Sequence, residues 1–283
     1  MSIAIISDTD TSLPESSLQQ FGIVQVSITI HFGEEVLSAC SEITDRGLVE
    51  RVVRDGIMPT TAAPSPGAFS EAYKQAFDKG ADEIICLTVS AGVSATYQSA
   101  LAAKELHPGK KITVFDTESI SMGQGFMVLE AARLAGMGKG KDEILEAVVD
   151  IRERTHLYAA LDTLKFMAMS GRVGHLTAEM ANVLSIKPIL TILDGKLDLL
   201  EKVRTRKKAW SRVLELSIES LGAGEVEEMY ILHVAAEDLA KEFESLLRAA
   251  MPCPDSIPVT GLTPGLSVHT GAGLVGVAFT TKT

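Results

Sequence analysis

Short apolar runs alternate with helix-like segments through the first half of the chain, and each run leads into a polar or glycine-containing turn. The runs have the length of buried strands, and the segments between them have the periodicity of helices. The predicted strands are residues 3–6, 83–89 and 111–115, and the predicted helices are residues 14–21, 94–106, 122–135 and 141–154. This alternation predicts a parallel α/β sheet.

Polar residues follow each of these predicted strands. Asp8 follows the first strand, residues 90–94 follow the second, and Asp116 follows the third. Parallel α/β sheets bind their ligands at the carboxyl ends of the strands. The sequence therefore predicts a ligand site at this edge of the N-terminal sheet.

The pattern changes after about residue 155. Two apolar segments flank Asp194-Gly195 and predict an antiparallel hairpin. The other predicted elements are helices at 207–221 and 237–250, a strand at 228–234, and closing strands near 257–259, 267–269 and 273–280. We expect two domains, an N-terminal α/β domain with a parallel sheet over residues 1–155 and a C-terminal α+β domain with a mixed or antiparallel sheet over residues 156–283.

The composition narrows the function. The chain has 283 residues, 46% of them apolar and only 5% aromatic, with ten methionines. An aliphatic interior rich in methionine adapts well to flexible apolar ligands. The formal charge of −11 argues against nucleic acid and against docking on an anionic membrane surface through net charge.

The cysteine, histidine and N-terminal patterns bear on compartment and cofactors. Three widely spaced cysteines, with no CxxC pair, fit a reducing compartment. The chain start lacks the features of a signal peptide, and no run reaches the ~20 apolar residues of a membrane span. The six histidines are not at metal-ligand spacing. We expect a cytoplasmic, soluble protein without a metal or stable membrane insertion.

Three distant polar segments, residues 60–67, 90–99 and 268–273, offer hydroxyls and one imidazole but no lysine or arginine. Such a set suits one small acidic or polar head group. Each segment also has a structural interpretation: Ser65 and Pro66 suit a helix start, Ser94 suits a helix N-cap, and His269 suits a satisfied core residue.

Two other functions remain open from the residues alone. Residues 92–96 approach the G-x-S-x-G nucleophile elbow, which would make Ser94 the nucleophile and His269 the base of an esterase-like hydrolase. Ser94 lies about five residues after the predicted strand, Thr96 replaces the last glycine, and no carboxylate is marked as the orienting group. The helix N-termini of the first domain would alternatively suit a sensor of a phosphorylated metabolite.

Residues 202–208 form the only dense positive run of this acidic chain. A solvated corner between a strand and a helix would account for it. The same local basicity would also attract an acidic protein partner or a phosphorylated ligand.

The whole chain resembles the DegV family of bacterial fatty-acid-binding proteins, because motifs typical of that family follow one another in family order. The matching segments are residues 6–9, 60–67, 90–100, 116–125, 164–173, 187–190, 201–208 and 269–271. The resemblance implies two α/β domains and a bound long-chain fatty acid, with no other cofactor.

The resemblance also implies roles for individual residues. The carboxylate of the fatty acid would be held by Thr61, Ser94 and His269. The chain would be a carrier without catalysis of its own, presenting the fatty acid to a fatty acid kinase that forms acyl phosphate for phospholipid synthesis. Arg172 and Arg204 would meet that kinase.

The loop around Thr61 departs from the family pattern. It reads Thr61-Ala62-Ala63-Pro64, where the family has Thr-Ser-Gln-Pro. Hydrogen bonds expected from the serine and glutamine side chains are therefore absent, which bears on carboxylate geometry and chain preference.

Overall fold

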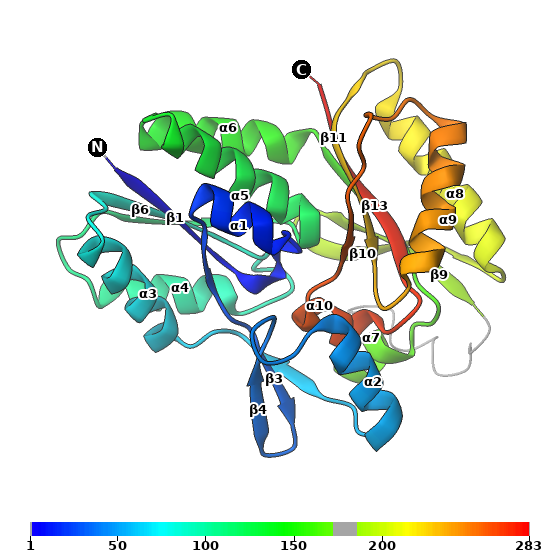
Figure 1. The fold of residues 1–283 in the computed structure, drawn as a ribbon, viewed down its shortest axis with the longest axis horizontal. Helices are drawn as coiled ribbons and strands as arrows, with labels where there is room; N and C mark the ends of the chain where they lie inside the picture. The colour runs from blue at the N-terminus through cyan, green and yellow to red at the C-terminus, as the bar shows by residue number, and fades with distance from the viewer. Residues whose placement is uncertain (1, 172–185, 283) are drawn as a thin grey trace. The chain divides into compact units, whose positions relative to one another are not determined.

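The computed structural model describes residues 2–171 and 186–282, grouped into two compact units (Figure 1). The first unit comprises Met1–Thr29, Thr61–Glu153 and Asp194–Lys196, and the second comprises Ile30–Thr60, Arg154–Leu193 and Leu197–Thr283. The chain passes from the first unit to the second after Glu153, close to the predicted domain boundary at residue 155. Residues 30–60 group with the second unit, however, because the helix in this segment packs against a C-terminal helix of that unit.

The first unit is built on a parallel four-stranded sheet with the order β2-β1-β6-β7. Its central strand β6 is buried along its whole length, as expected of a strand covered on both faces. The prediction of a parallel α/β sheet is therefore confirmed. The strands are β1 (Ile3–Asp8), β2 (Val24–Val26), β6 (Glu83–Thr88) and β7 (Ile112–Asp116).

Helices cover both faces of this sheet (Figure 1). On one face lie α3 (Pro66–Asp78) and α4 (Thr96–Glu105). The buried Phe69 and Tyr73 of α3 pack with Ile6 and Ile84 of the sheet. The other face carries α1 (Glu15–Phe21), α5 (Ser121–Gly136) and α6 (Lys141–Glu153), with the short helix η1 (Thr9–Thr11) beside α5.

The second unit contains a six-stranded mixed sheet with the order β10-β9-β8-β13-β11-β12. The pairs β9–β8, β8–β13 and β13–β11 are antiparallel, and β11–β12 is parallel, which confirms the predicted mixed sheet. The strands are β8 (Thr155–Ala160), β9 (Lys187–Leu193), β10 (Lys196–Val203), β11 (Val226–His233), β12 (Val259–Gly261) and β13 (Val275–Thr281).

The turn between β9 and β10 has positive φ at both central residues, 48° at Asp194 and 71° at Gly195. A two-residue hairpin turn of the primed type requires this conformation, and Asp-Gly is among its preferred sequences. The predicted hairpin is thus present.

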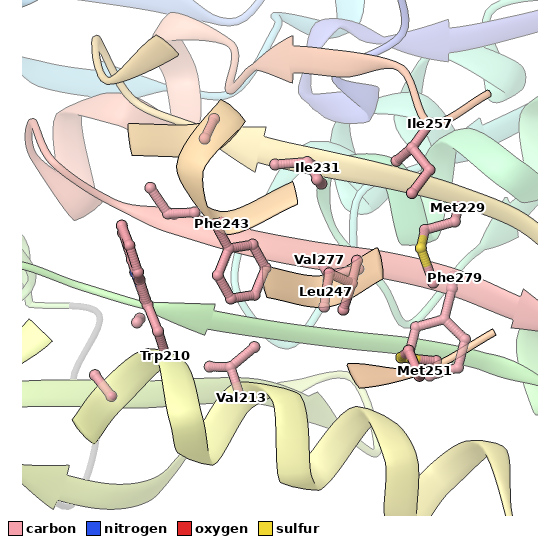
Figure 2. Close-up of a cluster of buried hydrophobic side chains, with 14 of the residues drawn as sticks. Trp210, Val213, Met229, Ile231, Phe243, Leu247, Met251, Ile257, Val277 and Phe279 are labelled. Atoms are coloured by element: carbon pink, nitrogen blue, oxygen red, sulfur yellow. The ribbon is translucent and has the colours of Figure 1, made fainter. Parts of the chain in front are cut away.

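An apolar core lies between this sheet and two long helices, α8 (Arg206–Leu221) and α9 (Glu237–Ala250), as Figure 2 shows. Trp210 of α8 and Phe243 of α9 meet edge to face with ring centroids 5.7 Å apart. Ile231, Val277 and Phe279 of the sheet close the core from the other side.

Three further helices of the second unit lie together, away from that core: α2 (Asp45–Asp55), α7 (Lys165–Ser170) and α10 (Pro264–Thr270), with α10 in contact with both others (Figure 1). The strand predicted near 267–269 is wrong, because these residues belong to α10. Thr263 is the N-cap and Pro264 opens the helix, a position that suits proline. A separate three-stranded sheet, β4-β3-β5, contains β3 (Thr29–Phe32), β4 (Glu35–Ser38) and β5 (Thr60–Ala62).

Candidate functional site

The carboxyl ends of β1, β6 and β7 lie side by side, because these strands are parallel neighbours in one sheet. Asp8 is the last residue of β1, Asp116 is the last residue of β7, and Ser90 follows the end of β6 closely. The polar segments predicted at the strand ends therefore do share one edge of the sheet.

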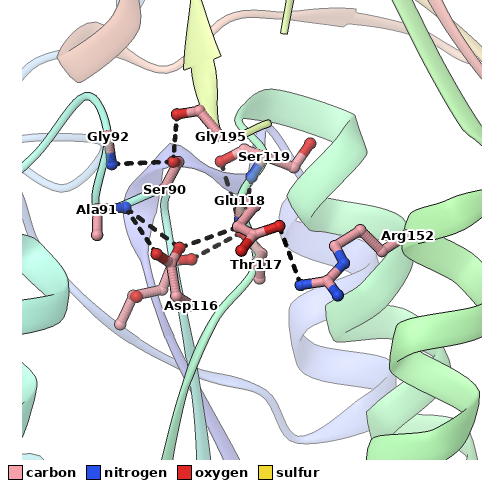
Figure 3. A network of polar contacts seen from close by, with 10 residues as sticks. Ser90, Ala91, Gly92, Asp116, Thr117, Glu118, Ser119, Arg152 and Gly195 are labelled. Atoms are coloured by element: carbon pink, nitrogen blue, oxygen red, sulfur yellow. Dashed lines mark hydrogen bonds and ion pairs between the residues drawn. The ribbon is translucent and has the colours of Figure 1, made fainter. Parts of the chain in front are cut away.

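Asp116 and Ser90 hold the loops at this edge (Figure 3). The Asp116 carboxylate accepts hydrogen bonds from the backbone N of Ala91 at 3.1 Å and of Glu118 at 2.9 Å. The Ser90 hydroxyl donates to the backbone O of Gly195 at 2.5 Å and accepts from the backbone N of Gly92 at 3.1 Å. These side chains bind the backbone of the loops and hold the loops together.

Gly92 is required by the same packing. A Cβ atom at position 92 would lie 2.3 Å from the backbone O of Gly195, far inside van der Waals contact. The first half of the loop from Ser90 to Ser94 is consequently held against the backbone of Gly195. The second half carries the predicted head-group residue Ser94.

Ser94 is half-buried and precedes α4. Its hydroxyl shares a hydrogen bond of 2.8 Å with the Thr96 hydroxyl and accepts from the Thr96 backbone N at 3.3 Å. The prediction of Ser94 as N-cap is wrong, since the cap residue is Ala95, which has no hydroxyl. Ser94 forms a local turn just before the helix instead.

Thr61 lies in β5 and is half-buried. Beyond it the chain enters α3 as predicted, with Ser65 as N-cap and Pro66 in the first turn. The Ser65 hydroxyl accepts from the backbone N of Ala68 at 3.2 Å. The cap fixes the loop of residues 62–65 at one end and β5 fixes it at the other, which gives Thr61 a defined backbone position.

His269 lies in the last turn of α10 and is half-buried, with its Nδ1 atom buried. Its neighbours Ser267, Val268, Gly271 and Ala272 line a cavity in the second unit. The helix that carries the imidazole thus also forms the wall of that cavity.

This cavity has a volume of about 70 Å³ and lies among α2, α7 and α10. Its wall is apolar apart from Ser267, whose hydroxyl donates to the backbone O of Leu262 at 3.4 Å. The other lining residues are Leu48, Val49, Val52, Val53, Met58, Pro59, Phe166, Val268, Gly271 and Ala272. A cavity with such a wall favours an apolar ligand.

The N-terminus of α2 is fixed to the six-stranded sheet of the same unit. The Asp45 Oδ2 atom accepts from the backbone N of Ala235 at 3.4 Å, and a Cβ at Gly261 would lie 3.0 Å from this oxygen. Arg46 and Glu237 add an exposed ion pair at 3.3 Å. The wall of the cavity formed by α2 is therefore anchored at one end.

The basic run forms the corner between β10 and α8, as its structural interpretation predicted. Arg204 is exposed at this corner, and Thr205 caps α8. Arg206 lies 3.7 Å from Asp162, which also binds Lys187. Arg172, the other predicted docking residue, lies outside the described residues.

Within residues 2–171 and 186–282, no group of histidine, cysteine, aspartate or glutamate side chains has the arrangement of a metal site. Among the helices of the described residues, none is long and apolar enough to cross a membrane.

Comparison with known proteins decides the family. The sequence profile of the DegV family, described as uncharacterised, matches residues 2–282. A DegV domain-containing protein of Streptomyces coelicolor is 32% identical over 280 residues, which are 99% of this chain and 99% of the relative. The chain belongs to the DegV family.

Solved DegV structures share the fold of this chain over its whole length. A DegV family protein from Thermus thermophilus, described as binding fatty acid, has a TM-score of 0.91 and 28% identity. The fatty acid binding DegV family protein of Streptococcus agalactiae has a TM-score of 0.90 and 27% identity. DegV of Bacillus subtilis, described as a fatty acid binding protein, has a TM-score of 0.88 and 28% identity. Each comparison covers 100% of both chains.

The residues predicted to hold a head group belong to different parts of this DegV chain. Thr61 and Ser94 lie in the first unit, and His269 lies in the second. The three-residue set stays a prediction.

The residues that line the apolar cavity of this DegV chain were not identified from the sequence. Leu48, Val49, Val52 and Val53 repeat at the spacing of one helix face, after Thr44 as N-cap, and this signal was sufficient to find α2. Phe166 carried no comparable signal, because one aromatic residue in a short helix does not show where its ring packs.

Asp8 is the strongly perturbed acid of the first unit. Its carboxylate accepts from the backbone N of Val89 at 2.7 Å, from that of Asp10 at 2.9 Å, and from Gln124 Nε2 at 3.2 Å. Burial raises the pKa of Asp8 to about 6, although these hydrogen bonds lower it. Because Val89 leads directly into the Ser90 loop, Asp8 positions the start of the segment that carries Ser94.

We predict that replacement of Asp8 by asparagine changes the pH dependence of stability. The folded-state pKa of Asp8, about 6, lies above its ordinary 3.8, so the wild-type protein loses stability as pH rises between these values. The loss is about 3 kcal/mol and is complete above pH ~6. Asparagine does not titrate, so relative to wild type the variant gains this amount across the window, whatever its absolute stability.

Urea unfolding of wild type, Asp8→Asn and the exposed control Asp255→Asn across this pH range measures the effect. Parallel pH profiles of wild type and Asp8→Asn would show that Asp8 does not titrate in this way.

Proposed function

We propose that this chain binds a long-chain fatty acid, with the acyl chain in the apolar cavity among α2, α7 and α10. The observation that carries the proposal is the wall of this cavity, which is apolar except for one hydroxyl that bonds to the backbone. The DegV proteins of Thermus thermophilus, Streptococcus agalactiae and Bacillus subtilis, each described as fatty-acid-binding, support it as relatives with the same fold.

The energy of burial is sufficient for tight binding. Each methylene removed from water contributes about 0.8 kcal/mol, so a long acyl chain gains on the order of 10 kcal/mol before the cost of association. The cavity of about 70 Å³ is smaller than the ~150 Å³ that accommodates benzene in an apolar core. Side chains of its wall must therefore move when an acyl chain enters.

The head group is the difficult part of such a ligand, because a buried carboxylate costs several kcal/mol unless its oxygens accept hydrogen bonds. We propose that Thr61, Ser94 and His269 donate these bonds. All three are half-buried, and His269 lies on the helix that lines the cavity. Ala62 and Ala63 add no side-chain donors, so the carboxylate depends on these three groups.

A ligand held in this way leaves slowly, so its head group must be exposed to a partner. We propose that the chain is a cytoplasmic carrier that presents the fatty acid to a fatty acid kinase, which forms acyl phosphate for phospholipid synthesis. The wide spacing of the cysteines supports the reducing compartment. The carrier itself needs no catalytic group.

We propose that Arg204 and Arg172 meet the kinase. Arg204 is exposed, and Arg206, Lys207 and Lys208 occupy the first turn of α8. Positive charges at the positive end of a helix dipole are unfavourable for stability. Their accumulation at this corner favours a role in binding an acidic surface.

The alternative functions gain no support from the site. β6 ends at Thr88 and α4 begins at Thr96, so Ser94 does not lie on the tight strand-to-helix turn of a nucleophile elbow. No observation in the described residues favours a phosphorylated-metabolite sensor.

We predict that the purified protein carries a fatty acid and that loss of any head-group donor weakens its retention. Thr61→Ala, Ser94→Ala and His269→Ala should each lower the affinity by about tenfold or more, because a hydrogen bond to a charged group is lost. Mass spectrometry of solvent extracts and competition with a fluorescent fatty acid measure content and affinity.

Ser245→Ala, on the exposed surface of α9, is the matched control. Unchanged affinity in all three head-group variants would remove them from the site. The absence of any fatty acid from the wild-type extract, together with no binding by the delipidated protein, would contradict the proposed function itself.

We predict that Arg204→Glu lowers acyl phosphate formation by the cognate kinase at least several-fold, because charge reversal opposes an acidic docking surface. The content of bound fatty acid should not change. Lys241→Glu, an exposed charge reversal on α9, controls for net charge. Loss of fatty acid from Arg204→Glu, or equal kinase activity with both variants, would contradict a docking role.

A further inference from the structure

Phe166 of α7 lies directly against Gly271, the C-cap residue of α10. A Cβ atom at position 271 would lie 2.1 Å from Cδ2 and 2.3 Å from Cε2 of the Phe166 ring. The ring therefore fills the space that any side chain at position 271 would need. Gly271 also has a φ of 75°, so glycine suits both the backbone and the ring.

Both residues line the apolar cavity. Phe166 is the one aromatic side chain among the described residues of its wall, and it is half-buried. The remaining wall belongs to smaller side chains of α2 and α10 and to Met58 and Pro59. The ring is thus the largest side chain of this wall.

We infer that Phe166 determines the volume that the cavity offers to an acyl chain. We also infer that Gly271, which has no side chain, leaves the space in which the ring lies and so keeps the ring out of the cavity. The inference rests on the proposed function. Because a packed interior cannot absorb a contact near 2 Å, a methyl group at position 271 must displace the ring. Removal of the ring must instead widen the cavity.

These two changes have opposite effects on an acyl chain. Gly271→Ala drives the ring toward the space that the ligand needs, so it weakens binding of all chains. Phe166→Ala enlarges that space, so it favours a chain of larger cross-section, such as one kinked by a cis double bond. In the double variant Phe166→Ala/Gly271→Ala the added methyl group has room, and binding returns.

The experiment uses delipidated full-length protein with palmitate and oleate as competing probes. Gly271→Ala should lower the affinity for palmitate on the order of tenfold, the size expected for overpacking. The double variant should bind palmitate within about threefold of Phe166→Ala, since neighbouring substitutions that share one contact are not additive. Phe166→Ala alone should raise the preference for oleate over palmitate.

Two controls separate the contact from other effects. Gly222→Ala changes another helix C-cap glycine with positive φ, 55°, where a Cβ would meet nothing within 4 Å, so it reproduces backbone strain without the clash. Met169→Ala removes a side chain of α7 that is 58% exposed and is not part of the cavity wall. Both controls should keep the wild-type preference for palmitate and oleate.

Several results would overturn the inference. Equal affinities of Gly271→Ala and Gly222→Ala, or a double variant as weak as Gly271→Ala, would show that the ring does not transmit the effect. If Gly271→Ala does not fold, an unchanged oleate preference in Phe166→Ala overturns the inference by itself. Failure of the wild-type protein to bind either probe would overturn the proposed function as well, whereas wild-type binding with unaltered variants would overturn only the role of Phe166.

Discussion

The packing of α10 against α2 and α7 is the constraint on which the proposed binding site depends. These helices come from distant parts of the chain, and their facing side chains enclose the apolar cavity. α10 contributes to the wall and also carries His269, so one short helix fixes the cavity and the imidazole together. Its path is determined by Pro264 at its start and by Gly271 at its end, where only glycine leaves room for the Phe166 ring.

In the first unit, charged side chains organise the backbone. Asp8 and Asp116 direct their oxygens to backbone N–H groups of the loops at the strand ends. Thr61 and Ser94 place hydroxyls at half-buried positions of the same unit. Recognition by hydroxyls and one imidazole suits a carboxylate that is bound by hydrogen bonds without a salt bridge.

Much of the fold could be predicted because the sequence signals were local. The Asp194-Gly195 turn, the Ser65-Pro66 helix start and the long amphipathic α9 each follow from the preferences of neighbouring residues. The prediction of short elements was wrong for the same reason, because they have few local signals. α10 is a seven-residue helix that contains a proline, a glycine and a threonine, so its sequence was mistaken in part for a strand, and its helical form depends on packing against α2 and α7.

The site was less accessible to sequence reasoning than the fold. No local pattern shows that α2, α7 and α10 meet, so the cavity and the contact between Phe166 and Gly271 emerge only in three dimensions. The grouping of residues 30–60 with the second unit has the same origin, since it depends on the contact of α2 with α10. Thr61, Ser94 and His269 were selected as a carboxylate site through resemblance to the DegV family, because hydroxyls and a histidine far apart in sequence do not by themselves identify one ligand.

The most direct test of this account is a crystal structure of the protein saturated with a long-chain fatty acid. We predict continuous density for the acyl chain among α2, α7 and α10, in contact with Leu48, Val52 and Val268. The carboxylate should lie within hydrogen-bond distance of Thr61, Ser94 and His269. An acyl chain bound elsewhere, with the side chains of this cavity undisturbed, would contradict it.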